Sequence, residues 1–273
     1  MSELLLSTNG LTKQYGHHKA VDKVNLHIKK GAIYGFIGRN GAGKTTCLKM
    51  ISGLARPTAG EIEMFGCKGK ELERIRSRVG CLIEAPGLYG NMNAYTNLKI
   101  KCELFGIRKK GYIEDILETV GLEGVGKKKT KHFSLGMKQR LGIGLALVGE
   151  PDLLVLDEPI NGLDPQGIAE VRDTIQRLRD ERNMTILISS HILEELSKIA
   201  TDYGIIHNGS LLQELTSEEL MKRCSERIEI ELIHPEQAVP ILDRMGFTNY
   251  QVTDKSLSLI HISEPTRRTP ISY

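Results

Sequence analysis

The sequence predicts an α/β protein built around a parallel sheet. Four short apolar runs, at 33–37, 79–83, 153–156 and 185–189, lack the polar alternation of a half-exposed strand. Such runs are typical of strands buried on both faces. Apolar residues elsewhere recur at helical spacing, as they do at 168–178. Buried strands that alternate with helices indicate a parallel sheet.

The segment before the first buried run also has the character of β structure. Val24, Leu26 and Ile28 alternate with polar residues, which is the period of a half-buried strand. A turn at 29–31 leads into the first buried run, and residues 61–65 return as a further strand. We therefore expect the N-terminal part of the chain to be rich in strands.

Residues 89 to about 149 interrupt this pattern. Their apolar side chains recur at helical rather than strand spacing. These side chains are Tyr95, Leu98, Cys102, Ile113, Ile116, Leu117 and Val120. We expect a helical insertion at about 89–149, which ends with the helix after Ser134.

After the buried run at 185–189, residues 203–207 and 211–215 flank Asn208-Gly209, which is a strong signal for a hairpin. The composition shifts after Leu220. A strand, a helix and two short strands then predict a small β-α-β-β appendix. We expect one domain at 1–220 and an accessory domain at 221–258.

Residues 259–273 do not continue this appendix. Their sequence, Ser263-Glu264-Pro265 and onward, resembles the read-through of sequencing-adapter DNA at the ends of some assembled genes. We interpret 259–273 as a non-native segment and leave it out of the fold prediction. A disordered native tail is the alternative.

The composition excludes several classes of protein. A net charge of +3 over 273 residues is too small to indicate a nucleic-acid partner. No apolar run approaches the roughly 18 residues of a membrane span, and the acidic segment 1–6 is unlike a secretory signal. Five cysteines without a Cys-x-x-Cys pair argue against zinc and disulfides and fit a reducing compartment. We expect a cytoplasmic protein that acts on membranes through a partner.

The densest basic run, at 127–129 with Lys131, lies inside the expected helical insertion. We interpret it as a solvated loop. The alternative is a site for acidic lipid or for the acidic surface of a partner.

A glycine-rich loop follows the first buried run. Gly38, Gly43, Lys44 and Thr45 satisfy the pattern Gly-x-x-x-x-Gly-Lys-Thr between a strand and a helix. Backbone N–H groups in such a loop cradle phosphates, and the helix that follows adds the positive end of its dipole. We expect Lys44 to reach the β- and γ-phosphates and Thr45 to hold Mg²⁺. The remaining binding residues of the loop are Asn40, Gly41 and Thr46.

By itself this loop leaves open GTPases, kinases, helicases and transport ATPases. Asp157 and Glu158 follow the buried run at 153–156, at the sheet edge where open α/β sheets bind ligands. Asp157 is suited to Mg²⁺, and Glu158 is suited to polarise the water that attacks the γ-phosphate. A nucleotide kinase does not need the second acid, so the pair favours hydrolysis.

His191 follows the buried run at 185–189 and is expected at the same edge of the sheet. We expect it to donate a hydrogen bond to charge that develops on the γ-phosphate. A structural role for this histidine is the alternative. The expected catalytic residues are therefore Lys44, Glu158 and His191.

These motifs together resemble those of ATP-binding-cassette (ABC) ATPases. The phosphate loop, the segment 133–140, the acid pair, Asn161-Gly162-Leu163-Asp164 and His191 occur in the family's order, over about 4–220. The resemblance implies a P-loop NTPase (RecA-like) parallel core with an N-terminal antiparallel β subdomain and an inserted helical subdomain. It also implies ATP hydrolysis with Mg²⁺, coupled to an integral-membrane permease at the cytoplasmic face of the membrane.

The same resemblance implies a head-to-tail homodimer with two ATP molecules between the subunits. Ser134 and Gly136 are then expected to contact the γ-phosphate held by the opposite subunit, because a serine at a helix N-terminus suits an anion. Tyr15 matches the family's aromatic residue that stacks on adenine. An ordinary half-buried loop tyrosine is the alternative for Tyr15.

Two departures from the family pattern are informative. The signature usually reads Leu-Ser-Gly-Gly-Gln, whereas residues 133–137 read Phe-Ser-Leu-Gly-Met. Glu84 stands where most members carry a glutamine that links Mg²⁺ and the attacking water to the membrane partner. Residues 83–89 and 133–143 resemble the bacitracin and lantibiotic branch, which serves antimicrobial-peptide export and self-protection. We expect Glu84 to bind Mg²⁺ more strongly than an amide, and hypothesise that it retunes the coupling of hydrolysis to transport.

A soluble ATPase of the same superfamily, in translation or DNA repair, is the alternative function. Translation members resemble two such units in one chain, and repair members carry long coiled coils. This sequence has one unit and no sustained heptads. A non-hydrolysing regulatory module is a third class, which the intact Asp157-Glu158 pair disfavours.

Overall fold

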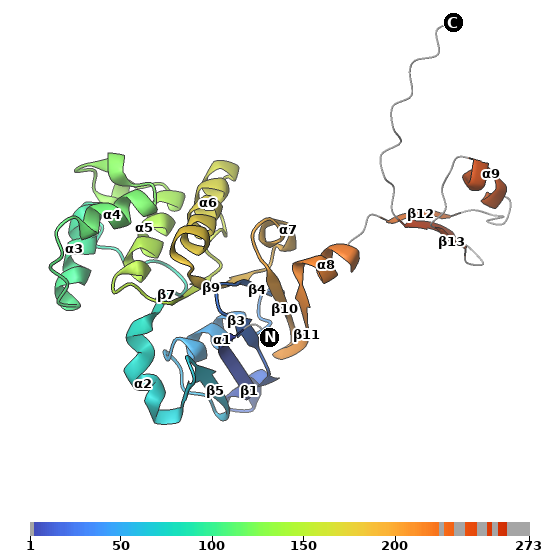
Figure 1. Ribbon diagram of the computed structural model, residues 1–273, viewed down its shortest axis with the longest axis horizontal. Helices are drawn as coiled ribbons and strands as arrows, with labels where there is room; N and C mark the ends of the chain where they lie inside the picture. Colours follow the sequence, from blue (N-terminus) through green and yellow to red (C-terminus); the bar gives the residue numbers. More distant parts are fainter. Residues whose placement is uncertain (1–2, 224–226, 232–237, 245–249, 253–255, 261–273) are drawn as a thin grey trace, which may run out of the picture. The chain divides into compact units, whose positions relative to one another are not determined.

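The computed structural model describes residues 3–223, 227–231, 238–244, 250–252 and 256–260. The chain divides into two compact units, Met1–Ser217 and Glu218–Tyr273. In the first unit, the described residues form two sheets and a group of helices (Figure 1). The two units are described separately below.

The predicted parallel sheet is the centre of the first unit. Its strand order is β11-β10-β4-β9-β8-β7, in which every neighbouring pair is parallel except β10 and β11. The Asn208-Gly209 turn joins those two antiparallel strands, as the hairpin signal predicts. The strands are β4 (Ile33–Ile37), β7 (Val79–Leu82), β8 (Leu153–Asp157), β9 (Thr185–Ser190), β10 (Asp202–His207) and β11 (Ser210–Thr216).

An antiparallel sheet forms the N-terminal subdomain, as expected. The long strand β1 pairs with β2, β3 and β5, and β5 pairs with β6. These strands are β1 (Leu4–Tyr15), β2 (His18–Val24), β3 (His27–Lys29), β5 (Ala59–Met64) and β6 (Cys67–Lys68).

The alternating segment at 24–28 is not one strand, contrary to the simplest interpretation of its period. The Thr8 hydroxyl donates to the Val24 carbonyl at 2.9 Å and accepts from the Leu26 N–H at 2.8 Å. The Thr8 hydroxyl therefore bonds the backbone on both sides of Asn25, beside the backbone bond from the Thr8 N–H to the Leu26 carbonyl at 3.0 Å. The chain ends β2 at Val24 and begins β3 at His27.

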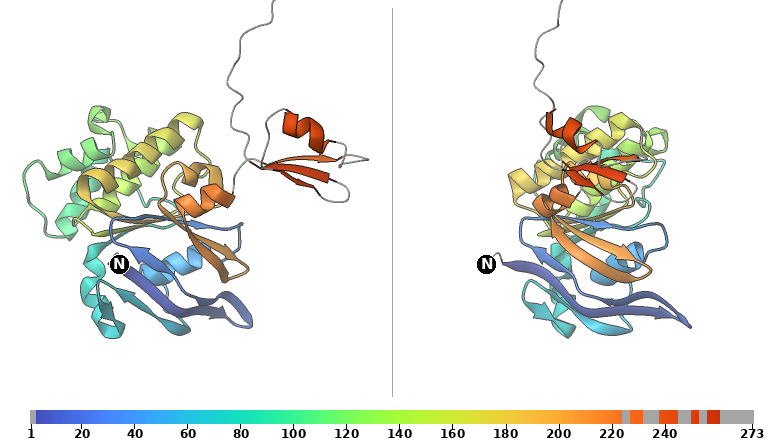
Figure 2. Two further views of the ribbon diagram at one scale, coloured as in Figure 1. Left: turned by 45° about the vertical axis from the view of Figure 1, so that its right-hand side comes forward. Right: turned by 90° about the vertical axis from the view of Figure 1, so that its right-hand side faces the viewer.

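Helix α1 (Lys44–Ile51) lies between the two sheets (Figures 1 and 2). Its Leu48 and Ile51 belong to one buried cluster with Leu6 of β1 and Val155 and Leu187 of the parallel sheet. On the opposite face of the parallel sheet, a Cβ at Gly35 would lie 3.2 Å from a methyl group of Leu196 in α7 (Leu193–Ser197), so this helix packs closely on β4. Side chains on both faces are thus covered, which explains the continuous apolar runs.

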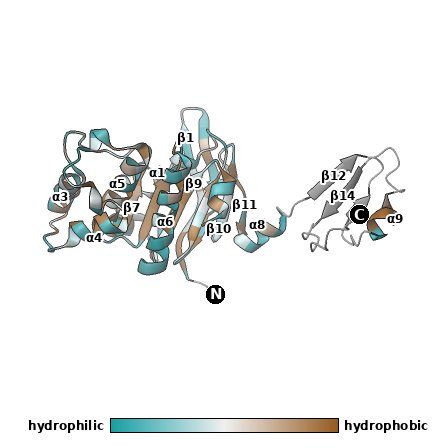
Figure 3. Ribbon diagram, turned by 90° about the horizontal axis from the view of Figure 1, so that it is seen from above, coloured by the Kyte–Doolittle hydropathy of each residue, from teal (hydrophilic) through white to brown (hydrophobic). Residues whose placement is uncertain are grey.

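The predicted helical insertion contains α3 (Ala94–Leu104), α4 (Tyr112–Thr119) and α5 (Leu135–Leu147). Helix α6 (Pro165–Arg182) packs beside α5 and against β9. It carries both hydrophilic and hydrophobic residues (Figure 3), and several of the latter are buried at helical spacing. The short helix α2 (Leu72–Ile75) lies between β6 and β7 in sequence. Arg140 of α5 ties the insertion together, because its guanidinium donates to the Val120 and Gly121 carbonyls after α4 and pairs with Glu170 of α6 at 2.9 Å.

The second unit begins within α8 (Ser217–Arg223) and contains β12 (Arg227–Glu231), α9 (Val239–Arg244), β13 (Tyr250–Val252) and β14 (Ser256–Ile260). This element order is the predicted β-α-β-β order, and the sheet order is β12-β14-β13. Leu259 and Ile260, the first two residues of the segment expected to be non-native, belong to β14 and pair with Ile228 and Arg227. The rest of that segment, 261–273, lies outside the described residues.

Within the described ranges, no helix is both long and apolar enough to cross a membrane. This agrees with the sequence, in which no run reaches the length of a membrane span.

The central strand β9 offers a test of this packing. We expect Leu187→Ala to lower the free energy of unfolding by about 2–5 kcal/mol, because Leu187 is fully buried and its removal leaves a cavity. Leu212→Ala on β11 is the control, since Leu212 is 63% exposed and should change stability by about 0.5 kcal/mol or less. Urea unfolding followed by circular dichroism measures both. Equal losses in the two variants would contradict the burial of β9.

Candidate functional site

The glycine-rich loop joins β4 to α1, in the context that the motif requires. Gly43 caps α1 with φ 103°, and a Cβ at this position would lie 2.4 Å from the Ala20 carbonyl oxygen. A Cβ at Gly38 would lie 2.5 Å from the Ile206 carbonyl oxygen. Both distances are too short for any side chain, so the neighbouring strands β2 and β10 require glycine here.

Lys44 begins α1 with a side chain that is only 5% exposed. Its ammonium donates to the carbonyl oxygens of Gly38 at 2.6 Å and Arg39 at 3.2 Å, and lies 3.1 Å from Glu158 Oε1. A buried cation is stable only with such partners. The loop and the acid pair therefore meet at one ammonium group, as the sequence analysis expected.

Asp157 ends β8 and is 4% exposed. Its carboxylate accepts hydrogen bonds from the Thr45 hydroxyl at 2.7 Å and from the Ser189 hydroxyl at 2.6 Å. The Ser189 oxygen also accepts from the Glu158 N–H at 3.0 Å. Three elements, α1, β8 and β9, are thus joined through one carboxylate.

Glu158 adopts φ 49°, a backbone conformation that side-chain-bearing residues rarely take. The hydrogen bond from its N–H to Ser189 holds this conformation. Its carboxylate lies beside Lys44 through Oε1 and contacts His191 Nδ1 through Oε2 at 2.8 Å. Lys44, Glu158 and His191 therefore form a continuous row of charged and titratable groups at the carboxyl edge of the sheet.

Ser189 is the residue of this site that the sequence analysis missed. It was treated only as part of a buried strand, yet it contacts both acids. A polar residue at the carboxyl end of an otherwise apolar strand was the available signal, because ligands bind at that edge.

A cavity of about 520 Å³ lies beside the loop. It is lined by Arg39, Asn40, Ala42, His191, His207 and Asn208. Asn40, a predicted binding residue, is exposed at this surface, and Gly41 beside it has φ 80°. Thr46 lies one residue further into α1 than Thr45 and is partly buried. Arg39 and His207 add two basic side chains that the motif pattern did not identify.

Two of the expected nucleotide contacts lie on other elements. Tyr15 ends β1 at the turn into β2, and its side chain is 52% exposed. The Lys13 ammonium lies 5.0 Å from the centre of its ring. The ring is therefore accessible for stacking on a base, and the adjoining strand β2 contacts Gly43 through Ala20.

The signature segment lies at the N-terminus of α5. Ser134 caps this helix, and its hydroxyl accepts from the Met137 N–H at 3.2 Å. Gly136 packs closely on the α6 backbone, since a Cβ there would lie 3.4 Å from the Gly167 Cα. Ser134 is exposed, and among the described residues its hydroxyl forms no hydrogen bond with the phosphate loop of its own chain. The structure thus does not bring Ser134 and Gly136 to Lys44.

Glu84 is not brought to the acid pair either. It adopts φ 64°, its side chain is 65% exposed, and its carboxylate accepts from the Lys49 ammonium at 2.5 Å. That hydrogen bond raises the pKa of Lys49. Lys49 lies one helical turn after Thr45 on α1, so Glu84 reaches the nucleotide site through Lys49 rather than by joining Asp157.

The residues suit Mg²⁺ without forming a closed metal cage. The Thr45 hydroxyl and the Asp157 carboxylate lie 2.7 Å apart and offer oxygen ligands, which Mg²⁺ prefers. In the part of the chain that the structure describes, no three His, Cys, Asp or Glu side chains gather as a metal site. Mg²⁺ commonly uses one or two protein oxygens together with phosphates and water, so this sparse set fits it.

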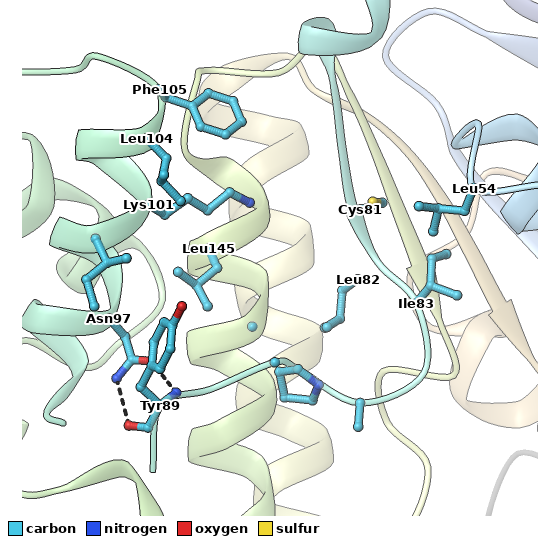
Figure 4. Close-up of a pocket in the computed structure, with 15 residues that line it drawn as sticks. Leu54, Cys81, Leu82, Ile83, Tyr89, Asn97, Lys101, Leu104, Phe105 and Leu145 are labelled. Atoms are coloured by element: carbon cyan, nitrogen blue, oxygen red, sulfur yellow. Dashed lines mark hydrogen bonds between the residues drawn. The ribbon is translucent and has the colours of Figure 1, made fainter. Parts of the chain in front are cut away.

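A second cavity, of about 400 Å³, lies between β7, α3 and α5 (Figure 4). Leu82, Ile83 and Leu145 form part of its apolar wall, and Tyr89 is held there by hydrogen bonds between its backbone and Asn97. Lys101 points into this cavity (Figure 4). Burial lowers the pKa of its ammonium. Ile83 and Ala85, the two neighbours of Glu84 in sequence, both line this cavity.

Comparison with known proteins identifies the family. Residues 21–161 match the family model described as "ABC transporter". The chain is 49% identical over 241 residues to the bacitracin transport ATP-binding protein BcrA of Bacillus licheniformis, covering 88% of this chain and 79% of the relative. It is 44% identical over 211 residues to the lantibiotic transport ATP-binding protein SrtF of Streptococcus pyogenes, covering 77% of this chain and 90% of the relative.

Solved structures agree in fold. The structure of an ATP-binding subunit of an ABC transporter matches with a TM-score of 0.69 and 29% identity, over 80% of this chain and 92% of the other. A dimeric bacterial ABC transporter cassette matches with a TM-score of 0.69 and 24% identity, over 78% and 98%. With the family model matched across the phosphate loop and the acid pair, the chain belongs to the ABC transporter family, as an ATP-binding subunit.

Proposed function

We propose that this chain hydrolyses ATP to power the export of an antimicrobial peptide of the bacitracin or lantibiotic type, or protection against it. The observation that carries the catalytic part is the contact of Lys44, Glu158 and His191 beside the Thr45–Asp157 pair. The peptide class is supported by the relatives, which are named for bacitracin and lantibiotic transport.

The reaction is an attack of water on the γ-phosphorus, which breaks its bond to the bridging oxygen and releases ADP and phosphate. Glu158 accepts the proton of the water through its carboxylate. His191, hydrogen-bonded to Glu158, orients that carboxylate and donates to the γ-phosphate. Lys44 exchanges its loop carbonyl partners for phosphate oxygens, which compensate its charge better.

Mg²⁺ is expected to bind the Thr45 hydroxyl and the Asp157 carboxylate, where it neutralises negative charge on the phosphates. Ser189 fixes Asp157 from the other side through its hydrogen bond. The carboxylate orientation is therefore set before a nucleotide binds. Such preorganisation lowers the cost of reaching the transition state.

The proposal includes a head-to-tail dimer in which each nucleotide contacts both subunits. Ser134 and Gly136 lie at an exposed helix N-terminus whose N–H groups favour an anion. Leu135 between them is 51% exposed, as expected of a surface that a second subunit covers. The likeness to a dimeric cassette is in keeping with such an assembly.

The same proposal places the chain at the cytoplasmic face of the membrane, bound to a permease. The second cavity is suited to receive a permease segment, because its apolar wall includes the exposed Leu54 and Tyr89. Glu84 lies between this cavity and α1, where Lys49 links it to the helix that carries Thr45. This route connects nucleotide chemistry to the permease. A soluble role in translation or repair is disfavoured, because the relatives are named as transport proteins.

Glu158→Gln tests the assignment of the base. We expect ATP turnover to fall by about 10²- to 10⁴-fold, because the amide cannot accept the proton, while ATP binding is retained. Steady-state phosphate release and nucleotide titration measure the two quantities. Glu181→Gln, the same change at an exposed residue of α6, is the matched control. Normal turnover in Glu158→Gln would remove Glu158 from the mechanism.

Complementation between two inactive variants tests the head-to-tail dimer. Ser134→Arg should block the contact with the opposite nucleotide, and Lys44→Ala should disable the phosphate loop of its own chain. We expect each variant alone to lose about 10²-fold or more in ATP turnover. A mixed dimer regains one intact composite site, so mixing should restore activity above either variant. If each site used Ser134 and Lys44 of one chain, mixing would restore nothing.

Glu84→Gln tests the link between hydrolysis and transport. In this variant Glu84 loses its charge contact with Lys49. We therefore expect the ratio of peptide protection to ATP turnover to change by about fivefold, a factor that corresponds to the free energy of one exposed ion pair. Growth under peptide challenge and ATPase assays of the permease complex measure this ratio. Glu63→Gln removes the exposed Lys68 ion pair on β5 and serves as control. Unchanged turnover and protection in Glu84→Gln would rule out the coupling role.

A further inference from the structure

The loop that joins α3 to α4 exposes apolar and basic side chains next to each other. Leu104 is 79% exposed and Phe105 is 50% exposed. Arg108, Lys109 and Lys110 follow after Gly106 and Ile107, and all three are exposed. We call residues 104–110 the α3–α4 loop.

The backbone of the α3–α4 loop is held in one conformation. Gly106 has φ 69°, its N–H donates to the Glu103 carbonyl at 3.1 Å, and the Ile107 N–H donates to the Cys102 carbonyl at 2.8 Å. These two bonds form a Schellman motif, which ends the helix and turns the residue after glycine back toward it. Ile107 is accordingly partly buried, whereas Leu104 and Phe105 remain outside.

The charges of this loop are poorly compensated. Lys109 makes a 3.8 Å contact with Glu150, in which both side chains are more than 60% exposed. Among the described residues, no ion pair joins Arg108 or Lys110 to a carboxylate. A cavity of about 550 Å³ beneath the loop is lined by four basic side chains but only two acidic ones, Glu103 and Glu114. Its basic lining consists of Lys99, Arg108, Lys109 and Lys110.

Apolar and cationic side chains in this order are the composition of a surface that lies at a membrane interface. Aromatic and aliphatic groups enter the boundary of the acyl chains, while arginine and lysine bind anionic headgroups. The basic run at 127–129 differs in this respect, because the exposed hydrophobic residue nearest to it across the Asn93–Lys129 bridge is Met92, which is only 38% exposed against 79% for Leu104. Charge alone therefore does not distinguish the α3–α4 loop, but its combination with Leu104 and Phe105 does.

We propose that the α3–α4 loop contacts the anionic surface of the lipid bilayer, with Leu104 and Phe105 in the headgroup region and Arg108, Lys109 and Lys110 against lipid phosphates. The proposal rests on the proposed function, which brings the chain to the membrane through a permease. It adds a direct contact with lipid that the permease does not supply.

The permease is a less suitable occupant for the whole loop. Leu104 and Phe105 are part of the rim of the cavity suited to the permease (Figure 4), but they remain 79% and 50% exposed. Arg108, Lys109 and Lys110 do not line that cavity but line the cavity beneath the α3–α4 loop. A headgroup layer offers many phosphates to three neighbouring cations. A single helix of the permease would need several acidic residues at matching positions to bind the same cations.

Vesicle binding of the full-length chain tests this inference without the permease. The probes are liposomes of phosphatidylcholine alone and of phosphatidylcholine with about 30% phosphatidylglycerol, an anionic lipid. We expect sedimentation with the anionic vesicles only, and weaker binding as salt screens the charges. The triple variant Arg108→Gln, Lys109→Gln, Lys110→Gln should bind on the order of a hundredfold more weakly. Leu104→Ser with Phe105→Ser should bind about tenfold more weakly.

The control removes the same charge elsewhere. Lys127→Gln, Lys128→Gln, Lys129→Gln should bind anionic vesicles nearly as well as the parent chain. Equal losses in the two triple variants would show that net charge alone attracts the vesicles, and would overturn the proposal. Unchanged vesicle binding in the α3–α4 variants, with weaker co-purification of the permease, would assign the loop to the permease instead.

ATP turnover without vesicles separates this inference from the proposed function. The α3–α4 variants should hydrolyse ATP normally, because none of their residues lies in the nucleotide site. Glu158→Gln should lose turnover yet bind vesicles as the parent chain does. A parent chain that binds anionic vesicles but does not hydrolyse ATP would contradict the proposed function alone, whereas α3–α4 variants that hydrolyse ATP and still bind vesicles as the parent does would contradict the lipid contact alone.

Discussion

The hydrogen bonds of the Asp157 carboxylate are the interaction on which the rest of the site depends. Asp157 is almost fully buried at the end of β8 and is satisfied by the Thr45 and Ser189 hydroxyls. A buried carboxylate without partners is costly, so α1, β8 and β9 must meet at this point. The phosphate loop is thereby fixed relative to the acid pair, and Glu158 is turned into its left-handed conformation beside Lys44.

This constraint explains the layers of the first unit. Helix α1 starts at the phosphate loop and must lie against the parallel sheet, which leaves its other side to the antiparallel sheet. Close approach of β2 and β10 to the loop then excludes any Cβ at Gly43 and Gly38. The helical insertion adjoins this core through α5 and α6. Within the insertion, the buried guanidinium of Arg140 joins α5 to the end of α4 and to α6.

The expected nucleotide contacts of one chain fall into two separate groups. Lys44, Glu158 and His191 lie together, whereas Ser134 lies at an exposed helix end without a phosphate loop of its own chain beside it. The proposed head-to-tail assembly of two copies would bring Ser134 of one chain to the phosphate loop of the other. Glu84 lies between the nucleotide-binding helix and the second cavity. Its carboxylate contacts Lys49 of α1, and its neighbours in sequence line the cavity.

The sequence by itself determined the class of fold, the phosphate loop and the acid pair, because these depend on local patterns: apolar runs, glycines at fixed spacing, and acids at a strand end. It also predicted that His191 lies at the same sheet edge. Only the tertiary structure showed that Ser189 contacts both acids, that Thr8 divides the strand at 24–28, and that Glu84 pairs with Lys49. Each of these contacts joins residues more than 15 positions apart through side-chain hydrogen bonds. Periodicity and spacing along the chain do not encode such contacts, because they arise only when packing brings separate elements together.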